Sequence, residues 1–321
     1  MRSIAKPGPD TASRKVFPLR ARGATLVEVL ALLAVLTTGL ALALPAVLFA
    51  REAARRGACR DNFKRLGIAL QNYHQAVGCF PPGAIWPRFQ YDDPRTPCLI
   101  HLLPYLNHEA LYHQIDFSVR GTLWCKGNNP DVIRVPIVEL LCPSDGRCGG
   151  TKANPYCGEI ALTNYMGFFG DSLADLYTDR AIFGANRGAR LDDILDGASH
   201  TLIVGEYLTG TPRDLRGQLW GDESAGSLIF TGLPPNSPRP DLVYPNPVVC
   251  DPTDPTINDG RANLPCDFGD GRSSDTAAAR SRHAGGVQVI TADGGVRFIG
   301  QTISPGVWRQ LGAMADGAVF E

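Results

Sequence analysis

The chain has 321 residues, of which 44% are hydrophobic and 20% are charged, so its composition excludes a wholly disordered protein and allows one large domain or two ordinary ones. Its formal net charge of −1 excludes a nucleic-acid-binding protein that relies on a strongly basic surface. With 35 glycines and 25 prolines, the body is expected to be rich in loops and to contain β-structure.

The first 23 residues form a basic segment. They contain six lysine or arginine residues and one aspartate, a charge of +5, which leaves −6 for the rest of the chain. A short basic head on an acidic body indicates a targeting segment rather than a part of the fold.

An uncharged apolar run follows, with the sequence VLALLAVLTTGLALALPAVLFA over residues 29–50. At ~1.5 Å per residue, a helix of this length crosses the ~30 Å hydrocarbon core of a bilayer. The run has no polar face, which disfavours a buried helix of a soluble protein. It is also longer than the apolar stretch of a cleaved secretory signal. Pro45 is expected to kink this helix without ending it.

The helical pattern continues beyond the apolar run. Apolar residues recur at spacings of three and four between Phe63 and Val77, and basic residues occupy another side. We therefore predict one continuous helix from about Ala24 to Val77, ended by the prolines at 81 and 82. Its first half is expected in lipid, and its second half is expected to dock on a globular domain.

The segment Gly23-Ala24-Thr25-Leu26-Val27-Glu28 resembles the type IV prepilin cleavage and methylation motif. The resemblance implies that a prepilin peptidase cuts after Gly23, that Ala24 is then methylated, and that Glu28 aids subunit docking. Ala24 stands where that family usually has phenylalanine. In a fibre, Glu28 would pair with the α-amino group of a neighbouring Ala24, which satisfies two charges in an apolar setting. An ordinary signal anchor with an incidental glutamate is the alternative.

An ordered series of further motifs covers residues 22 to about 300. It includes Arg51-Glu52-Ala53-Ala54-Arg55-Arg56, Cys59-Arg60-Asp61-Asn62-Phe63-Lys64-Arg65-Leu66-Gly67, Asn72-Tyr73-His74, Phe80-Pro81-Pro82-Gly83, Leu141-Cys142-Pro143-Ser144-Asp145, Thr163-Asn164-Tyr165-Met166-Gly167, Asp196-Gly197-Ala198-Ser199-His200-Thr201-Leu202-Ile203-Val204-Gly205-Glu206, and His283 nine residues before Asp293-Gly294. This series resembles the pilin-like family DUF1559, whose members share such a helix and a terminal H-x9-DG motif. The family has no established biochemical activity, so the resemblance implies an architecture rather than a role.

The expected fold is α+β and pilin-like, with the long N-terminal helix packed on an antiparallel β-sheet with long loops. Four parts are expected: a basic prepilin leader (1–23), a transmembrane helix segment (24–50), its amphipathic continuation (51–80) and an exported globular domain (81–321).

Within the globular domain, residue spacing predicts helical segments over 98–116, 131–141 and 190–196, with Leu191, Ile194 and Leu195 facing inward in the last. Residues 201–204 are predicted to form a buried strand. Two strands, 287–291 and 296–299, flank Asp293-Gly294, a pair that tolerates the backbone of a tight hairpin turn.

The family-motif residues His283, Asp293 and Gly294 have both geometric and chemical interpretations. The turn geometry is the favoured account of Asp293-Gly294, and His283 is expected to be a structural clamp on the hairpin rather than a metal ligand. Glu206, His283 and Asp293 are the residues that would form a hydrolase site if they converged, but nothing in their spacing demands it.

Residues 233–282 are rich in proline, aspartate, asparagine and glycine, and are expected to form a long surface excursion. Acidic side chains outnumber basic ones in its second half. A solvated acidic loop is the favoured interpretation, and no cofactor is expected. A Ca²⁺ site is the weaker alternative, although the spacing matches no EF-hand loop. Its candidate ligands are Asp251, Asp254, Asp259, Asp267 and Asp270.

The chain has nine cysteines, and an export segment implies an oxidising compartment in which disulfides form. Spacing favours Cys250–Cys266 and a pair within Cys142, Cys148 and Cys157, although connectivity cannot be deduced from sequence. The odd number leaves at least one thiol free or joined to another chain. Zinc is disfavoured because the chain contains no Cys-x2-Cys pair.

Together these features predict a membrane-anchored pilin-like or pseudopilin subunit that assembles rather than catalyses. The implied partners are prepilin peptidase, a pilus or type II secretion assembly platform, like pilin subunits and membrane lipid, with no nucleic acid. The expected location is the inner membrane, with a short cytoplasmic leader and an exported C-terminal domain that reaches a cell-surface or periplasmic fibre. The alternative is an exported enzyme or ligand-binding protein that uses a pilin-type anchor.

Overall fold

A computed structural model describes most of the chain, which divides into two units at Arg51–Glu52. The described residues are 23, 25–85, 96–119, 129–146, 149–155, 157–211, 214–221, 224–258, 263–271 and 273–317. The prepilin leader up to residue 22, together with Ala24, Cys125, Cys148 and Asp259, therefore lies outside them.

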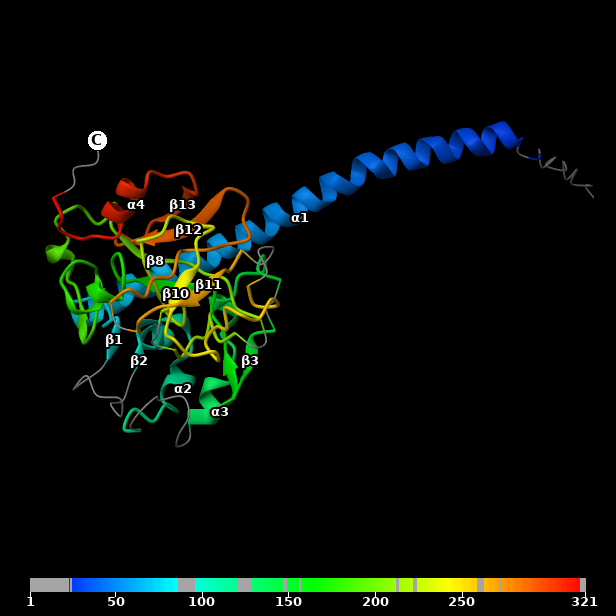
Figure 1. The fold of residues 1–321 in the computed structure, drawn as a ribbon. Helices are drawn as coiled ribbons and strands as arrows, with labels where there is room; N and C mark the ends of the chain where they lie inside the picture. Colours follow the sequence, from blue (N-terminus) through cyan, green and yellow to red (C-terminus); the bar gives the residue numbers. More distant parts are fainter. Residues whose placement is uncertain are drawn as a thin grey trace, which may run out of the picture. The chain divides into compact units, whose positions relative to one another are not determined.

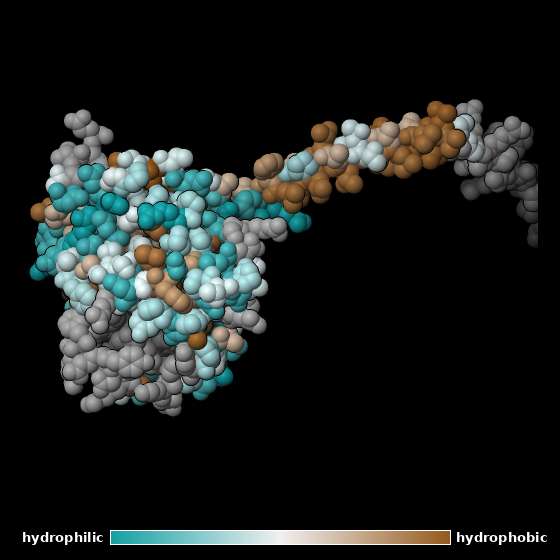
Figure 2. Space-filling model, viewed as in Figure 1, coloured by the Kyte–Doolittle hydropathy of each residue, from teal (hydrophilic) through white to brown (hydrophobic). Residues whose placement is uncertain are grey.

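The longest element is helix α1, Leu26–Val77, which continues through Pro45 as predicted (Figure 1). Every residue from 26 to 50 is exposed, and Figure 2 shows the brown of apolar side chains along this part of the helix. By length and composition, α1 is able to cross a membrane once. The helix ends where Gly78 adopts a φ of +88°, a left-handed conformation that favours glycine and stops helices.

The largest sheet among the described residues has five strands in the order β13-β12-β8-β5-β9; Figure 1 labels β13, β12 and β8 of this sheet. All neighbouring strands are antiparallel except β5 and β9, which are parallel. The strands are β5 Tyr165–Phe168, β8 Leu202–Glu206, β9 Leu228–Ile229, β12 Gly286–Thr291 and β13 Val296–Gly300. The predicted strand at 201–204 and the predicted C-terminal hairpin are both confirmed.

The second half of α1 packs on this globular unit along one face. Its buried residues follow the spacing of three and four that the sequence predicted, namely Cys59, Phe63, Leu66, Gly67, Ala69 and Leu70. The ring of Phe63 lies edge-on to the ring of Tyr165 in β5, with centroids 4.5 Å apart. Burial of each large apolar side chain stabilises the docked helix by roughly 1.5–3 kcal/mol. The α+β, pilin-like fold class is thereby confirmed.

The three predicted helical segments are shorter than expected and mostly of the 3-10 type. Residues 98–116 contain η1 Cys98–Leu106 and α2 Glu109–Tyr112. Residues 131–141 overlap α3 Asn129–Ile133 and η3 Val138–Leu140. Residues 190–196 contain only η5 Leu191–Asp193. Prolines at 104 and 136 remove backbone donors, which prevents longer α-helices. The prediction that Leu195 faces inward is wrong, because 77% of it is exposed.

Short elements complete the globular unit. The remaining helical turns are η4 Leu173–Tyr177 and α4 Pro305–Leu311. The two-stranded ladders are β1 Ala84–Ile85 with β2 Thr96–Pro97, β3 Thr151–Asn154 with β4 Gly158–Ala161, and β6 Phe183–Gly184 with β7 Arg187–Gly188.

The prediction of a surface excursion over 233–282 is wrong in part. Strands β10 Asp241–Val243 and β11 Cys266–Phe268 pair in parallel there, and Val243, Ile257 and Leu264 are buried. The charged residues Asp241 and Arg280 are fully buried as well. The segment contributes to the core because its charged residues pair with one another inside the protein, a pairing that composition alone does not reveal.

That buried pairing is an ion network of two arginines and two aspartates. Arg280 donates to Asp241 Oδ1 and Oδ2 at 2.7 and 2.9 Å, and to the carbonyl oxygen of Ser237 at 2.6 Å. Arg216 donates to Asp214 Oδ2 at 2.6 Å, and its other amino group lies 3.8 Å from Asp241. All four charged side chains are inaccessible to solvent, and their charges sum to zero.

Candidate functional site

The structure gathers an ionisable cluster around His283, which lies in the loop before β12 and has a fully buried side chain. Its Nδ1 lies 3.1 Å from Glu52 Oε1 on α1, and its Nε2 lies 3.1 Å from Glu206 Oε1 at the end of β8. One imidazole therefore joins the helix to the sheet through two carboxylates.

Both carboxylates are held in place by further hydrogen bonds. The second oxygen of Glu206 accepts a hydrogen bond of 2.7 Å from the backbone N–H of Gln288 in β12. Glu52 also accepts hydrogen bonds from Arg55 at 2.9 Å and from the hydroxyl of Ser144 at 3.1 Å. The histidine is thus fixed on both sides by groups whose own positions are determined.

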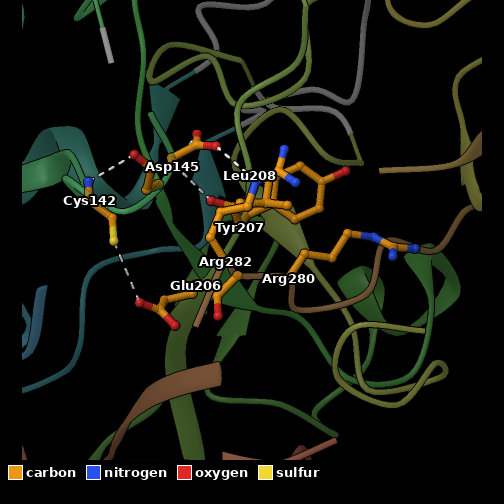
Figure 3. Close-up of a pocket in the computed structure, with 9 residues that line it drawn as sticks. Cys142, Asp145, Glu206, Tyr207, Leu208, Arg280 and Arg282 are labelled. Atoms are coloured by element: carbon orange, nitrogen blue, oxygen red, sulfur yellow. Dashed lines mark hydrogen bonds and ion pairs between the residues drawn. The ribbon is translucent and has the colours of Figure 1, made fainter. Parts of the chain in front are cut away.

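A disulfide adjoins this cluster. Cys59 of α1 is bonded to Cys142, which is 83 residues away in the sequence. The sulfur of Cys142 lies 3.6 Å from His283 Nε2 and 4.0 Å from Glu206 Oε1. Figure 3 shows the Cys142 sulfur and the Glu206 carboxylate pointing toward one another.

The charges of the cluster reinforce each other. Burial by itself lowers the pKa of His283, but its hydrogen bonds and charge pairing with Glu206 and then Glu52 outweigh burial and raise this pKa above its usual value. For Glu52, burial raises the pKa, but hydrogen bonds from Arg55, His283 and Ser144 together lower it. The arrangement therefore favours the protonated imidazolium form of His283 and the ionised form of Glu52.

The other end of the H-x9-DG motif forms the turn between β12 and β13. Asp293 Oδ1 accepts hydrogen bonds from the backbone of Gly295 at 2.9 Å and from the hydroxyl of Thr291 at 2.6 Å. Gly294 has a φ of +82°, which a residue with a side chain rarely adopts. The carboxylate of Asp293 is used to close the turn, as the geometric interpretation expected, and it is not among the ligand atoms gathered around His283.

The turn also rests on α1. Gln71 donates a hydrogen bond of 2.7 Å to the carbonyl oxygen of Ala292, and a Cβ atom placed on Gly67 would lie only 2.8 Å from the carbonyl oxygen of Gly294. Both ends of the H-x9-DG motif therefore hold the same helix: His283 through Glu52, and Asp293-Gly294 through Gly67. We call these contacts the helix clamp.

A small pocket lies next to the cluster, with an empty volume of about 170 Å³. Cys142, Asp145, Glu206 and Arg282 are among its lining residues (Figure 3). That figure includes open solvent, and the space that admits the centre of a water molecule is about 10 Å³, room for about one water. The pocket suits water or a single ion better than an organic substrate.

A protein-family model described as "Protein of unknown function (DUF1559)", SBP_bac_10, matches residues 49–306. The chain belongs to the DUF1559 family. No curated protein and no solved structure matches it. The matched region contains the whole helix clamp and leaves out residues 1–48, where the prepilin-type motif lies. Membership of DUF1559, together with the apolar part of α1, fits a membrane-anchored exported protein.

The N-terminal motif of this DUF1559 protein has a local structural role as well. Glu28 Oε2 accepts a hydrogen bond of 2.8 Å from the Thr25 backbone, and the Thr25 hydroxyl accepts one of 3.3 Å from the Glu28 backbone. This reciprocal pair is a capping box at the start of α1. The capping box has a sequence signal, Thr-x-x-Glu, which lies inside the prepilin-type motif.

The structure pairs Cys250 with Cys266, the pairing that the sequence favoured. Cys157 is also disulfide-bonded, whereas Cys142 is joined to Cys59 rather than to a nearby cysteine. Cys79 and the buried Cys98 are free thiols.

The acidic residues of the DUF1559 excursion act locally where the structure describes them. Asp251 and Asp254 each accept hydrogen bonds from a threonine two residues later, and Asp270 accepts from Ser273 and Ser274. Asp267 accepts from the backbone of Phe268. Among the residues that the structure describes, no three of these carboxylates come together as a group of ligands.

Sequence reasoning missed most of the cluster. Glu52, Cys59 and Cys142 come from segments that are 231, 224 and 141 residues away from His283. Of the cluster's members, the hydrolase hypothesis joins only Glu206 and His283, together with Asp293. No local spacing signals a site whose members are this far apart along the chain.

Replacement of Gly67 by alanine should destabilise the DUF1559 domain, because the new Cβ would contact the Gly294 carbonyl. Overpacking of ~1–3 kcal/mol opposes a helix-propensity gain of ~1 kcal/mol, so we expect a net loss of about 1 kcal/mol. Gly57 of the same helix is the matched control, since a Cβ added there would have no neighbouring atom within 4 Å. Gly57→Ala should stabilise by about 0.5–1 kcal/mol. Chemical unfolding of both variants gives the comparison, and equal shifts would contradict the contact.

The pH dependence of stability should reflect the His283 pair in the disulfide-bonded, metal-free protein. Because the folded pKa of His283 is raised, its contribution is complete below about pH 6.5 and is lost as pH rises through the folded pKa. Because the pKa of Glu52 is lowered, its contribution is lost as pH falls below its ordinary value near 4.5. The measurement is the unfolding midpoint of the wild type and of His283→Gln between pH 4 and 9. On the alkaline side, the midpoint of the variant should fall less steeply than that of the wild type. Parallel curves for the two proteins would refute the ion pair between His283 and its carboxylates.

Proposed function

We propose that the protein is a membrane-anchored, pilin-like or pseudopilin subunit that assembles into a surface or periplasmic fibre. One observation carries this proposal: the two halves of α1 have opposite environments. Residues 26–50 are apolar and exposed throughout, whereas Cys59 to Leu70 are buried against the globular unit along one face. A subunit stored in lipid and later bundled with its copies needs this division, because its first half must exchange lipid for neighbouring helices.

The proposed processing follows from the N-terminal motif. Prepilin peptidase cuts after Gly23, and Ala24 becomes the methylated N-terminus. The other partners are lipid before assembly, an assembly platform during it, and like subunits in the fibre. The leader lies in the cytoplasm and the globular unit is exported from the inner membrane, where the disulfides form.

The role is proposed to be structural rather than catalytic. His283 is buried between two carboxylates, and the adjacent pocket has room for about one water molecule. These features support a histidine that joins elements rather than one that meets a substrate.

The full-length chain, expressed with prepilin peptidase, should lose residues 1–23 when its intact mass is measured. Gly23→Leu should block this processing completely, because the residue before the scissile bond has to fit a small pocket in the peptidase. Expression without the peptidase is the control. Normal cleavage of Gly23→Leu would rule out the pilin-type account of this segment.

The wild-type chain should then be recovered in fibres sheared from the cell surface, or from the periplasm after overproduction. A wild-type chain that is processed yet stays in the membrane fraction under every condition would favour the alternative, an anchored enzyme or binding protein.

A further inference from the structure

We propose that Cys59, Cys142, Glu206 and His283 form a zinc site when the Cys59–Cys142 disulfide is reduced. The inference does not depend on the pilin-like role. In the disulfide form, the two sulfurs are bonded to each other. In the reduced form, the same four side chains supply two thiolates, one imidazole and one carboxylate, which are the ligand types that zinc takes in proteins.

The ligand atoms already lie in a compact group. One ligand atom from each of the four buried residues lies within 4.8 Å of all the others. The Cys142 sulfur is 3.6 Å from His283 Nε2 and 4.0 Å from Glu206 Oε1. Bond lengths of ~2.0–2.3 Å place the corners of a zinc tetrahedron roughly 3.3–3.8 Å apart. The largest movement required is separation of the two sulfurs once their bond is broken.

The groups behind the ligands also match a metal centre. A histidine that binds zinc usually directs its other ring nitrogen to a carboxylate or carbonyl group, which fixes the tautomer and the ring orientation. His283 directs Nδ1 to Glu52 at 3.1 Å while Nε2 faces the cluster. Glu206 has one oxygen held by the backbone of Gln288 at 2.7 Å and its other oxygen turned toward the cluster.

The reaction balances with a dithiol reductant. The dithiol attacks the Cys59–Cys142 bond, becomes a cyclic disulfide, and gives its two electrons and two protons to the protein as two thiols. Binding of Zn²⁺ then releases both thiol protons and the Nε2 proton of the His283 imidazolium, while Nδ1–H stays directed at Glu52, so three protons go to solvent for each ion bound. The product has two thiolates, one imidazole and one carboxylate around the ion, a total charge of −1.

The proposed exchange keeps α1 attached to the globular unit in both redox states. The disulfide joins Cys59 of α1 to Cys142, and the zinc ion would join the same two residues while also holding Glu206 and His283. Reduction without metal would leave the helix attached by noncovalent contacts alone, namely the helix clamp and the apolar packing of residues such as Phe63.

The test uses the full chain in detergent, reduced with dithiothreitol, freed of reductant under argon, and titrated with Co²⁺. We expect one Co²⁺ per chain, with thiolate-to-cobalt absorption in the near ultraviolet and the visible bands of a tetrahedral site. One equivalent of Zn²⁺ should abolish these bands and raise the unfolding temperature of the reduced chain. The oxidised chain should show neither effect.

Variants locate the ion. The double variant Cys250→Ser, Cys266→Ser should keep the bands, since this pair forms a separate disulfide. Cys59→Ser should lose most of the near-ultraviolet absorption. Glu52→Gln should weaken zinc binding by roughly 10–100-fold, because Glu52 orients the ligand His283 through its Nδ1. Glu109 is an exposed carboxylate on α2, so Glu109→Gln should leave zinc binding unchanged.

Three outcomes would overturn the proposal. The first is a reduced wild-type chain without thiolate-to-cobalt bands. The second is full retention of the bands in Cys59→Ser, which would place the metal on other cysteines. The third is a reduced wild-type chain whose unfolding temperature is unchanged by Zn²⁺. The first and third require no variant, so they decide the question even if a substituted chain fails to fold.

Discussion

Glu28→Ala should be cleaved after Gly23 and inserted into the membrane like the wild type, yet be almost absent from sheared fibres. In the proposed fibre, the Glu28 carboxylate pairs with the α-amino group of a neighbouring subunit's Ala24. Loss of one partner leaves the other as an uncompensated charge among apolar helices, so we expect incorporation to fall by on the order of tenfold or more. An ordinary anchor would tolerate a neutral residue here, because an intramembrane carboxylate is unfavourable by itself.

The capping box between Thr25 and Glu28 provides a second reason for a glutamate at this position, and the two reasons can be separated. Glu28→Gln keeps a side-chain oxygen that accepts the Thr25 backbone hydrogen bond but removes the charge. If charge pairing drives assembly, Glu28→Gln should fail as Glu28→Ala does. Thr25→Val, which removes the hydroxyl acceptor of the same box, should then assemble nearly normally.

The measurement is the ratio of each variant in the sheared-fibre and membrane fractions, with intact mass as the check on processing. Wild-type-like incorporation of Glu28→Gln would assign Glu28 to helix capping and remove its proposed role in docking. Equal loss in Thr25→Val and Glu28→Gln would point to the same conclusion.

Arg280→Met should cost the globular unit about 3–5 kcal/mol in free energy of unfolding, because it breaks a buried ion pair and leaves Asp241 without its main partner. The remaining cation near Asp241 is Arg216, at 3.8 Å, and it is already paired with Asp214. Three carbonyl acceptors of the Arg280 guanidinium would also lose their donor, including that of Ser237.

Arg239→Met is the matched control, since Arg239 is exposed and its backbone carbonyl, which serves the network, is kept in the variant. Its effect should stay within about 0.5 kcal/mol. The double variant Arg280→Met, Asp241→Asn removes one charge of each sign and should be less destabilised than Arg280→Met alone. Denaturant unfolding measures all three, and similar midpoints for Arg280→Met and Arg239→Met would show that the network contributes little.

Sequence patterns predicted the elements that local chemistry specifies. The long helix follows from an apolar run and from spacings of three and four, and its end is predicted by the prolines at 81 and 82. The hairpin follows from Asp293-Gly294. The Asp293 side chain accepts hydrogen bonds from Thr291 and Gly295, each only two residues away, and these bonds close the turn. In each case the interactions that specify the element lie within a few residues of one another.

The excursion and the cluster could not be predicted for the opposite reason. Composition marked 233–282 as polar, but Asp241 and Arg280 are buried together although they are 39 residues apart. The absence of a Cys-x2-Cys pair disfavours zinc, yet the residues of the proposed site, Cys59, Cys142, Glu206 and His283, each come from a different segment. Such pairings are set by tertiary packing, which leaves no periodic trace in the sequence.

The partners of the helix clamp lie far apart along the chain, so during translation the helix is synthesised well before the hairpin that holds it. Glu52 leaves the ribosome 231 residues before His283, and Gln71 leaves 221 residues before Ala292. At ~5–20 residues per second, about 10–50 s pass between synthesis of the helix and synthesis of the hairpin that holds it. During this interval the docking face of the helix lacks the hairpin that contacts Gly67 and Gln71, and its apolar residues Phe63, Leu66 and Leu70 lack the complete globular unit that buries them. A nascent chain must therefore be protected from aggregation by lipid or a chaperone until the segment from His283 onward arrives.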